Sequence, residues 1–258
     1  EIGSQLKGRP IEYYSNDSLL LTGYLSESHT DSVKGTIILV HGIRGRKEHF
    51  IGLSKLLAER GYNAVLMDLR AHGQSEGQYC TFGVKEKEDI SLLVDKLQML
   101  EQGKVVLIGT VGVWGQSLGG AVALQAMSID SRIKFGVIES TFSNFESIAH
   151  DYLEYFMGFS IKPLSNYMVH RSGDLGGFDP SQASPLDACK RITQPVFMAH
   201  GDKDRKINIK YGEANFKALA SKQKEFVDIK DASHVSVWNK GGEEYFEKVF
   251  KFIDDFKN

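Results

Sequence analysis

Short apolar runs recur along the chain at lengths typical of buried strands. An antiparallel hairpin is predicted N-terminal to these runs, with strands over Ile11–Ser15 and Leu19–Ser26 joined by Asn16-Asp17. The apolar runs themselves are Thr36–Val40, Ala64–Leu69, Val111–Trp114, Phe135–Ile138, Val196–Ala199 and Glu225–Ile229. They alternate only weakly between apolar and polar residues, so we expect a sheet that is covered on both faces.

Between these runs, apolar residues repeat every three or four positions, which predicts amphipathic helices. One such stripe includes Phe50, Leu53 and Leu57 and ends at Gly61, a second runs from Ile90 to Leu100, and a third from Phe246 to Ile253. Repeated alternation of strand and helix is typical of parallel strands with helices on both faces. The predicted fold class is therefore α/β, with a mostly parallel, doubly wound sheet of about eight strands.

The alternation is interrupted between residues 142 and 190, where aromatic residues are concentrated. Within this stretch, apolar residues from Phe145 to Phe156 fall on one helical face. A segment this short is too small for a core of its own. We therefore expect a single domain over residues 1–258, with residues 142–190 forming a short helical, lid-like insertion.

Composition excludes several classes of protein. With 31 Lys and Arg against 33 Asp and Glu, the formal net charge of −2 argues against a nucleic-acid partner, which requires a basic surface. The 41% hydrophobic content argues against disorder. The two cysteines, Cys80 and Cys189, are expected to be free thiols, with one disulfide as the alternative. No cluster has metal-ligand spacing, so neither metal nor cofactor is expected.

The stretch from Val105 to Ile129 carries no charged residue and is long enough to cross a bilayer. Glycines and polar residues in its middle instead favour a buried strand, a tight turn and a buried helix. No membrane anchor and no signal peptide is visible in this chain, so a cytoplasmic location is expected. Export after removal of a leader is the alternative.

The motif G-x-S-x-G occurs twice, around Ser75 and around Ser117. A nucleophile elbow requires a buried strand before the serine and a helix after it. Val111–Trp114 precedes Ser117 and a helix-forming run follows it, whereas the residues after Ser75 do not predict a helix. Ser117 is thus the predicted nucleophile, and Ser75 is expected to be a polar loop residue.

A serine nucleophile requires a histidine base and an acid that orients the histidine. In the elbow-bearing fold the acid follows the serine and the histidine comes last, which points to His234, the final histidine, after the last predicted strand. The loop after Val196–Ala199 offers Asp204 and Asp202, and its spacing favours Asp204. Glu139 is a more remote candidate for the acid.

The remaining parts of the site are predicted from position in the chain. Backbone N–H groups must stabilise the oxyanion, and those of Leu118 and Ile43 are our candidates. The histidines of the pairs His41-Gly42 and His200-Gly201 are expected to bond to loop backbone. An apolar substrate group is expected against the aromatic insertion. The predicted pocket residues are Phe142, Phe145, Tyr152 and Phe156.

As an ordered set, these landmarks resemble the α/β-hydrolase superfamily. The set comprises His41-Gly42, the segment Asp68–Ser75, Gly115-Gln116-Ser117-Leu118-Gly119-Gly120, His200-Gly201-(x)2-Asp204 and Ala232-Ser233-His234. The resemblance extends from about Ile11 to the C-terminus and is nearest to esterases and lipases with a small lid. It implies Asp204 as the acid and a structural role for the loop that contains Ser75. Dehalogenases and epoxide hydrolases carry Asp at the elbow, which Ser117 argues against.

The sequence therefore predicts a serine hydrolase that cleaves carboxylic esters through an acyl-enzyme on Ser117. Its expected partner is a small-molecule ester with an apolar group. A serine peptidase or amidase of the same superfamily is the first alternative, because the same three residues serve both reactions. The second is a homologue that has kept the fold as a ligand-binding pocket without catalysis. The sequence leaves the natural substrate, the acyl-chain preference and the oligomeric state open.

Overall fold

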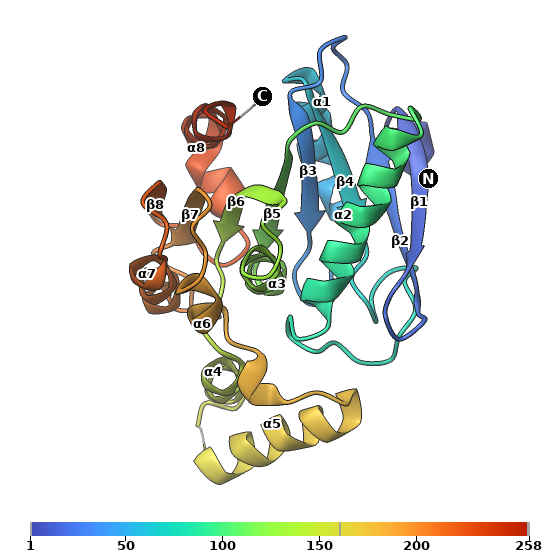
Figure 1. The fold of residues 1–258 in the computed structure, drawn as a ribbon. Helices are drawn as coiled ribbons and strands as arrows, with labels where there is room; N and C mark the ends of the chain where they lie inside the picture. Colours follow the sequence, from blue (N-terminus) through green and yellow to red (C-terminus); the bar gives the residue numbers. More distant parts are fainter. Residues whose placement is uncertain (1, 160, 257–258) are drawn as a thin grey trace.

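The computed structural model describes residues 2–159 and 161–256 and contains one eight-stranded sheet (Figure 1). The strand order is β1-β2-β4-β3-β5-β6-β7-β8, with β1 and β2 antiparallel to their neighbours and all later pairs parallel. The predicted fold class and the N-terminal hairpin are confirmed. The strands are β1 Gly8–Tyr14, β2 Leu20–Ser26, β3 Gly35–Val40, β4 Tyr62–Met67, β5 Val111–Gln116, β6 Ile133–Glu139, β7 Val196–Gly201 and β8 Lys224–Ile229.

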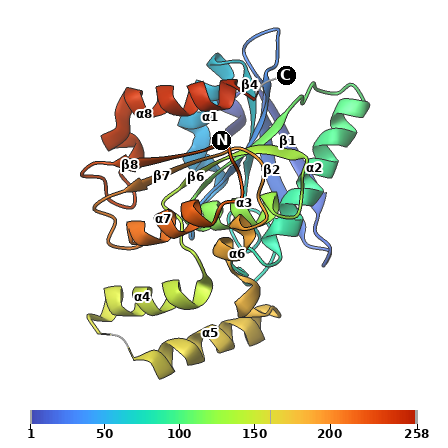
Figure 2. The ribbon, with the colours of Figure 1, turned by 60° about the vertical axis from the view of Figure 1, so that its left-hand side comes forward.

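Helices cover both faces of the sheet. One apolar core includes residues of α1 and α8, and the other includes residues of α2, α3 and α7. Figure 2 shows α1 and α8 on one side of the strands and α2, α3 and α7 on the other. The helices are α1 Ile51–Glu59, α2 Glu86–Gln102, α3 Leu118–Met127, α4 Phe145–Met157, α5 Lys162–Gly176, α6 Pro185–Cys189, α7 Ile209–Ala218 and α8 Val237–Asp254, with 3-10 turns at Ile2–Ser4, Lys47–Phe50 and Pro180–Gln182.

The uncharged stretch from Val105 to Ile129 folds as predicted. It contains β5 and α3, both buried, with the turn between them at Ser117. Among the described residues, no helix has the length and apolar character needed to cross a membrane. Cys80 and Cys189 are free thiols, as expected.

Within the insertion predicted over residues 142–190, α4 and α5 lie side by side away from the sheet (Figures 1 and 2). The 3-10 turn Pro180–Gln182 and α6 follow them, and α6 packs against α3 and α7. The Asn144 side chain caps α4 by accepting from the Ser147 N–H, and Gly158 ends the helix in a left-handed conformation. The predicted helix is confirmed as α4, with Phe145 and Ile148 of the predicted face buried, whereas Phe156 at its end is 73% exposed and Leu153 is buried instead. The pattern did not predict α5, because its mostly polar sequence leaves only Ser165, Val169 and Gly173 buried.

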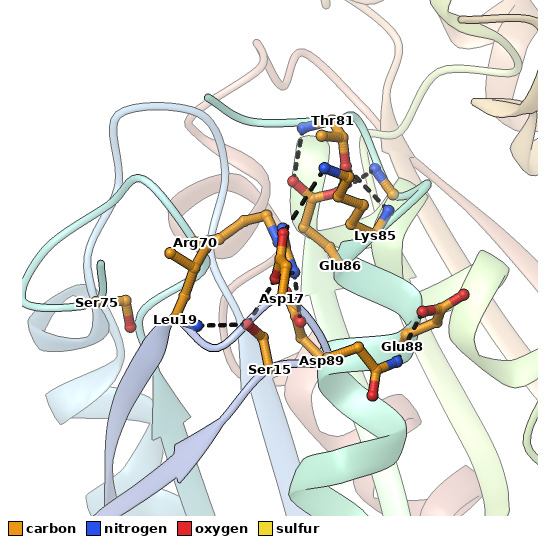
Figure 3. A network of polar contacts seen from close by, with 12 residues as sticks. Ser15, Asp17, Leu19, Arg70, Ser75, Thr81, Lys85, Glu86, Glu88 and Asp89 are labelled. Carbon is orange, nitrogen blue, oxygen red and sulfur yellow. Dashed lines mark hydrogen bonds and ion pairs between the residues drawn. The ribbon is translucent and has the colours of Figure 1, made fainter. Parts of the chain in front are cut away.

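A buried guanidinium joins the N-terminal hairpin to α2 (Figure 3). Arg70 donates to both oxygens of Asp89, each at 2.7 Å, and also binds Asp17 in the β1–β2 turn. The side chains of Arg70 and Asp89 are 4% and 1% exposed. Removing one member of such a pair leaves the other charge buried without a partner, which is far more destabilising than losing a surface pair.

We expect Arg70→Met to lower the free energy of unfolding by about 3–5 kcal/mol, because Asp89 then remains buried and unpaired. Urea denaturation measures this loss. The double variant Arg70→Met/Asp89→Leu should recover most of it, because no buried charge remains. Arg9→Met breaks the more exposed Arg9–Glu27 pair and should cost at most about 1 kcal/mol. If Arg70→Met and Arg9→Met lowered the free energy of unfolding equally, the buried Arg70–Asp89 pair would not have the structural role assigned to it.

Candidate active site

Ser117 occupies a strained turn between β5 and α3. Its backbone has φ 55° and ψ −119°, a conformation that side-chain-bearing residues rarely adopt. Two glycines of the motif make the turn possible. A Cβ at Gly119 would lie 1.9 Å from the Val40 carbonyl oxygen. A Cβ at Gly115 would lie 2.3 Å from the Gly119 carbonyl oxygen. The motif therefore requires glycine on both sides of the serine.

His234 lies between Ser117 and Asp204. Its Nε2 is 3.0 Å from Ser117 Oγ, and its Nδ1 is 2.7 Å from Asp204 Oδ2. An ionised carboxylate can only accept, so Nδ1 carries the hydrogen and the Nε2 lone pair faces the serine hydroxyl. In this arrangement the imidazole is able to take the proton of Ser117.

The Asp204 carboxylate is held from both sides. Its Oδ1 accepts from the N–H groups of Lys206 and Ile207, each at 2.9 Å, and His200 Nε2 lies 3.5 Å from Oδ2. Burial alone would raise the pKa of Asp204, but the hydrogen bonds to His200, His234 and the backbone outweigh it and lower the pKa to about 2. The carboxylate is therefore ionised at neutral pH.

The structure brings the three predicted catalytic residues together and leaves the competing candidates elsewhere. Ser75 Oγ donates to the Asp68 carbonyl at 2.7 Å and accepts from the Thr22 N–H, as expected for a loop residue. Asp202 makes no hydrogen bond to His234, among the contacts the structure describes. Glu139 is also not bonded to the histidine, and its own partners lie on β5 and α8.

The two His-Gly pairs act on loop backbone, as predicted. His41 accepts from the Leu69 N–H and donates to the Gly42 carbonyl, and burial lowers its pKa to about 4. The neutral ring thereby holds the loop in place where Gly42 passes Ser117; a Cβ at Gly42 would lie 3.2 Å from that of Ser117. His200 donates to the Ile207 carbonyl at 2.8 Å and so fixes the loop that carries Asp204.

The two candidate oxyanion donors flank Ser117. Leu118 is the first residue of α3, where backbone N–H groups have no intrahelical partner and attract negative charge. Ile43 lies in the loop after β3 and lines the cavities that contain Ser117. Within the described chain, no backbone acceptor pairs with the Ile43 N–H. Both groups are thus free to bind an oxygen that develops negative charge.

Two cavities meet at Ser117. One, of about 470 Å³, is walled mainly by apolar side chains of α4 and α5, and all four predicted pocket residues, Phe142, Phe145, Tyr152 and Phe156, line it. The other, of about 380 Å³, is more polar and also includes His234. A substrate whose carbonyl lies at Ser117 can therefore place unlike groups on its two sides.

Gln116, Lys206 and Trp238 are among the residues of the polar cavity that sequence reasoning did not find. Gln116 and Trp238 donate to the buried Glu139 carboxylate, which Trp114 and Tyr245 also bind. Burial raises the pKa of Glu139, and these four donors oppose the rise. The only sequence features that could have pointed to these residues are that Gln116 directly precedes Ser117 and that Trp238 follows His234 by four residues.

Together, the sheet order, the elbow at Ser117 and the placement of His234 define the protein as an α/β-hydrolase. A family model described as serine aminopeptidase, S33 (Hydrolase_4) matches residues 31–169. The chain belongs to this family. The match includes Ser117 and ends before Asp204 and His234.

Individual relatives are distant. The chain is 24% identical over 243 residues to the uncharacterized protein YqkD of Bacillus subtilis, covering 92% of this chain and 76% of that protein. It is 31% identical over 110 residues to the putative esterase YitV of Bacillus subtilis, covering 39% of this chain and 42% of that protein. Among solved structures, the Pyrococcus furiosus esterase Pf2001 superposes with a TM-score of 0.79 at 23% identity, covering 99% of this chain and 94% of the esterase. The structural likeness shows a shared fold.

The lowered pKa of Asp204 predicts a pH dependence of stability. Because the pKa falls from 3.8 to about 2, the ionised carboxylate contributes stability that is fully present above about pH 4 and is lost as the pH falls toward 2. The difference in unfolding free energy between wild type and Asp204→Asn should be constant at neutral pH and shrink by about 1 kcal/mol at pH ~3.

Urea denaturation at a series of pH values measures this difference. Asp228→Asn is a suitable control, because it removes a carboxylate that is exposed on β8, whereas Asp204 is buried. A difference for Asp204→Asn that stays flat down to pH ~3 would show that the carboxylate gains nothing from its partners.

Proposed function

We propose that this protein is a serine hydrolase that cleaves carboxylic esters through an acyl-enzyme on Ser117. The observation that carries the proposal is the pair of contacts at His234, 3.0 Å to Ser117 Oγ and 2.7 Å to Asp204 Oδ2. A hydroxyl, an imidazole and a buried carboxylate in this order activate a serine for attack on a carbonyl carbon.

The reaction begins when His234 Nε2 accepts the proton of Ser117 as Oγ attacks the ester carbonyl. Negative charge then develops on the carbonyl oxygen, and the N–H groups of Leu118 and Ile43 stabilise it. The C–O bond to the alcohol breaks, and His234 returns its proton to the leaving oxygen. Water, deprotonated by His234, attacks the acyl-enzyme and releases the carboxylic acid and free Ser117.

The apolar cavity accommodates the apolar group of the substrate. Phe156, Met157 and Met168 line this cavity and are also 73%, 51% and 46% exposed, so the cavity opens onto an apolar outer surface of α4 and α5. An acyl chain entering by this route remains against apolar side chains. Burial of each methylene contributes about 0.8 kcal/mol, which favours longer chains until the cavity is full.

Peptide hydrolysis at an N-terminus is the second candidate, because the matched family is described as serine aminopeptidase. That activity requires a group that binds the ammonium of the first residue, normally a free carboxylate. The carboxylate lining the polar cavity belongs to Glu139, whose oxygens already accept from four side chains. Lys206 also lines the cavity, and its positive charge favours an ester over a peptide N-terminus.

A fluorophosphonate probe tests the nucleophile. We expect labelling of wild type, loss of labelling in Ser117→Ala and full labelling in Ser75→Ala, which is the matched control from the other G-x-S-x-G motif. Gel fluorescence and mass mapping of the labelled peptide measure this. Labelling that persists in Ser117→Ala would remove the assignment, and a folded wild type that is never labelled would favour a non-catalytic binding protein.

A panel of 4-nitrophenyl esters and 4-nitroanilides with the same acyl groups tests the substrate class. We expect kcat/KM for esters to rise by up to about fourfold per added methylene until the cavity is full. The matched anilides and aminoacyl anilides should be cleaved far more slowly. Ala149→Phe places a ring in the apolar cavity and should shift the optimum to shorter chains while acetyl ester turnover is retained. Preference for aminoacyl anilides would establish the aminopeptidase instead.

A further inference from the structure

The polar cavity at Ser117 differs from the apolar one in its charged lining. Besides His234, the ionisable side chains that line it are His49, Glu139, Tyr152 and Lys206. Because the acyl chain is assigned to the apolar cavity, the polar cavity faces the other side of the scissile carbonyl. Its charged groups therefore act on the part of the substrate that leaves.

Glu139 is not available to a ligand. Its side chain is 1% exposed and accepts from Trp114 and Gln116 on β5 and from Trp238 and Tyr245 on α8. These donors occupy the lone pairs of both carboxylate oxygens. A cationic substrate group would have to displace one of these donors to reach the carboxylate.

Lys206 differs from Glu139, to which four side chains donate, in that its charged group has no ion-pair partner in the described part of the chain. It is half-buried in the cavity wall and, among the described residues, no carboxylate lies within ion-pair distance of its ammonium. Its backbone is fixed, because the Lys206 N–H donates to Asp204 Oδ1 at 2.9 Å. The carboxylate that orients His234 thus also fixes the backbone from which the Lys206 side chain starts.

A loop beside the cavity carries two further cationic side chains. The loop that lines the cavity at Ile43, Gly45 and His49 also carries Arg44 and Arg46, both exposed and without an ion pair in the described chain. Glu48 of this loop lies 3.9 Å from Lys47 Nζ. Positive charge on a loop beside a cleft raises the local concentration of anionic substrates.

We propose that the polar cavity is an anion subsite in which the Lys206 ammonium binds a carboxylate or phosphate on the leaving part of the substrate. The substrate class is then an ester with an apolar acyl group on one side and an anionic group on the other. This inference rests on the proposed ester hydrolysis and narrows its substrate. The site differs from the catalytic set, since Lys206 takes no part in proton transfer.

Three butanoyl esters that differ in the charge of the leaving phenol test this subsite. The leaving groups are 4-hydroxybenzoate, its neutral methyl ester and 4-(trimethylammonio)phenol. Relative to the neutral ester, Lys206→Gln should lower kcat/KM for the carboxylate ester by about tenfold, mainly through KM, and Lys206→Arg should restore it. Lys206→Glu should reverse the order in favour of the cationic ester. Lys203→Gln, on the same loop and exposed, should leave all ratios unchanged.

Binding to the Ser117→Ala protein separates this proposal from the proposed function, because it needs no turnover. Calorimetry with benzoate, phenylphosphonate and the neutral benzamide should show tighter binding of the anions, lost with Lys206→Gln. The tighter of the two anions identifies the group that the site prefers. Equal ratios in wild type, Lys206→Gln and Lys206→Glu, or a wild-type preference for the cationic ester, would overturn the subsite. Absence of any ester turnover, with anion binding intact, would overturn only the proposed function.

Discussion

The geometry of this site depends on one close approach, that of α3 to the ends of β3 and β5. Gly119 lies so near the Val40 carbonyl that no side chain fits between them, and Gly115 lies too near Gly119 for a side chain as well. The contact accompanies a positive φ at Ser117, which directly precedes the first N–H groups of α3. Packing of apolar surface around the two glycines therefore stabilises a backbone conformation that would otherwise be unfavourable.

A second constraint holds the base and the acid in position relative to this turn. The loop from Gly201 to Ile207 folds around the Asp204 carboxylate. His200 donates to the Ile207 carbonyl at the end of this loop. Glu139 joins Gln116, directly before the nucleophile, to Trp238, four residues after the base. The two sides of the site are thus linked through one buried carboxylate that takes no proton in the proposed reaction.

The sequence allowed prediction of the fold class and the order of the strands along the chain, because buried parallel strands leave continuous apolar runs. It also allowed selection of Ser117 over Ser75, since only the former lies between a buried strand and a helix. The predicted positions of the strand ends were less accurate. The strand predicted over Ala64–Leu69 runs from Tyr62 to Met67, because Asp68 turns its side chain to Lys47 and the Gln74 N–H. Contacts such as those of Glu139 join residues about a hundred positions apart, and no local pattern reveals them.

The chain has two tryptophans, Trp114 and Trp238, and both indoles donate to the same Glu139 carboxylate. Trp238 also lines the polar cavity, whereas Trp114 is fully buried behind it. All indole emission from the native protein therefore originates beside the Glu139 carboxylate, from one ring that lines the cavity and one that is enclosed. Occupancy of the cavity can be followed in real time from intrinsic fluorescence, with no label attached to either enzyme or ligand.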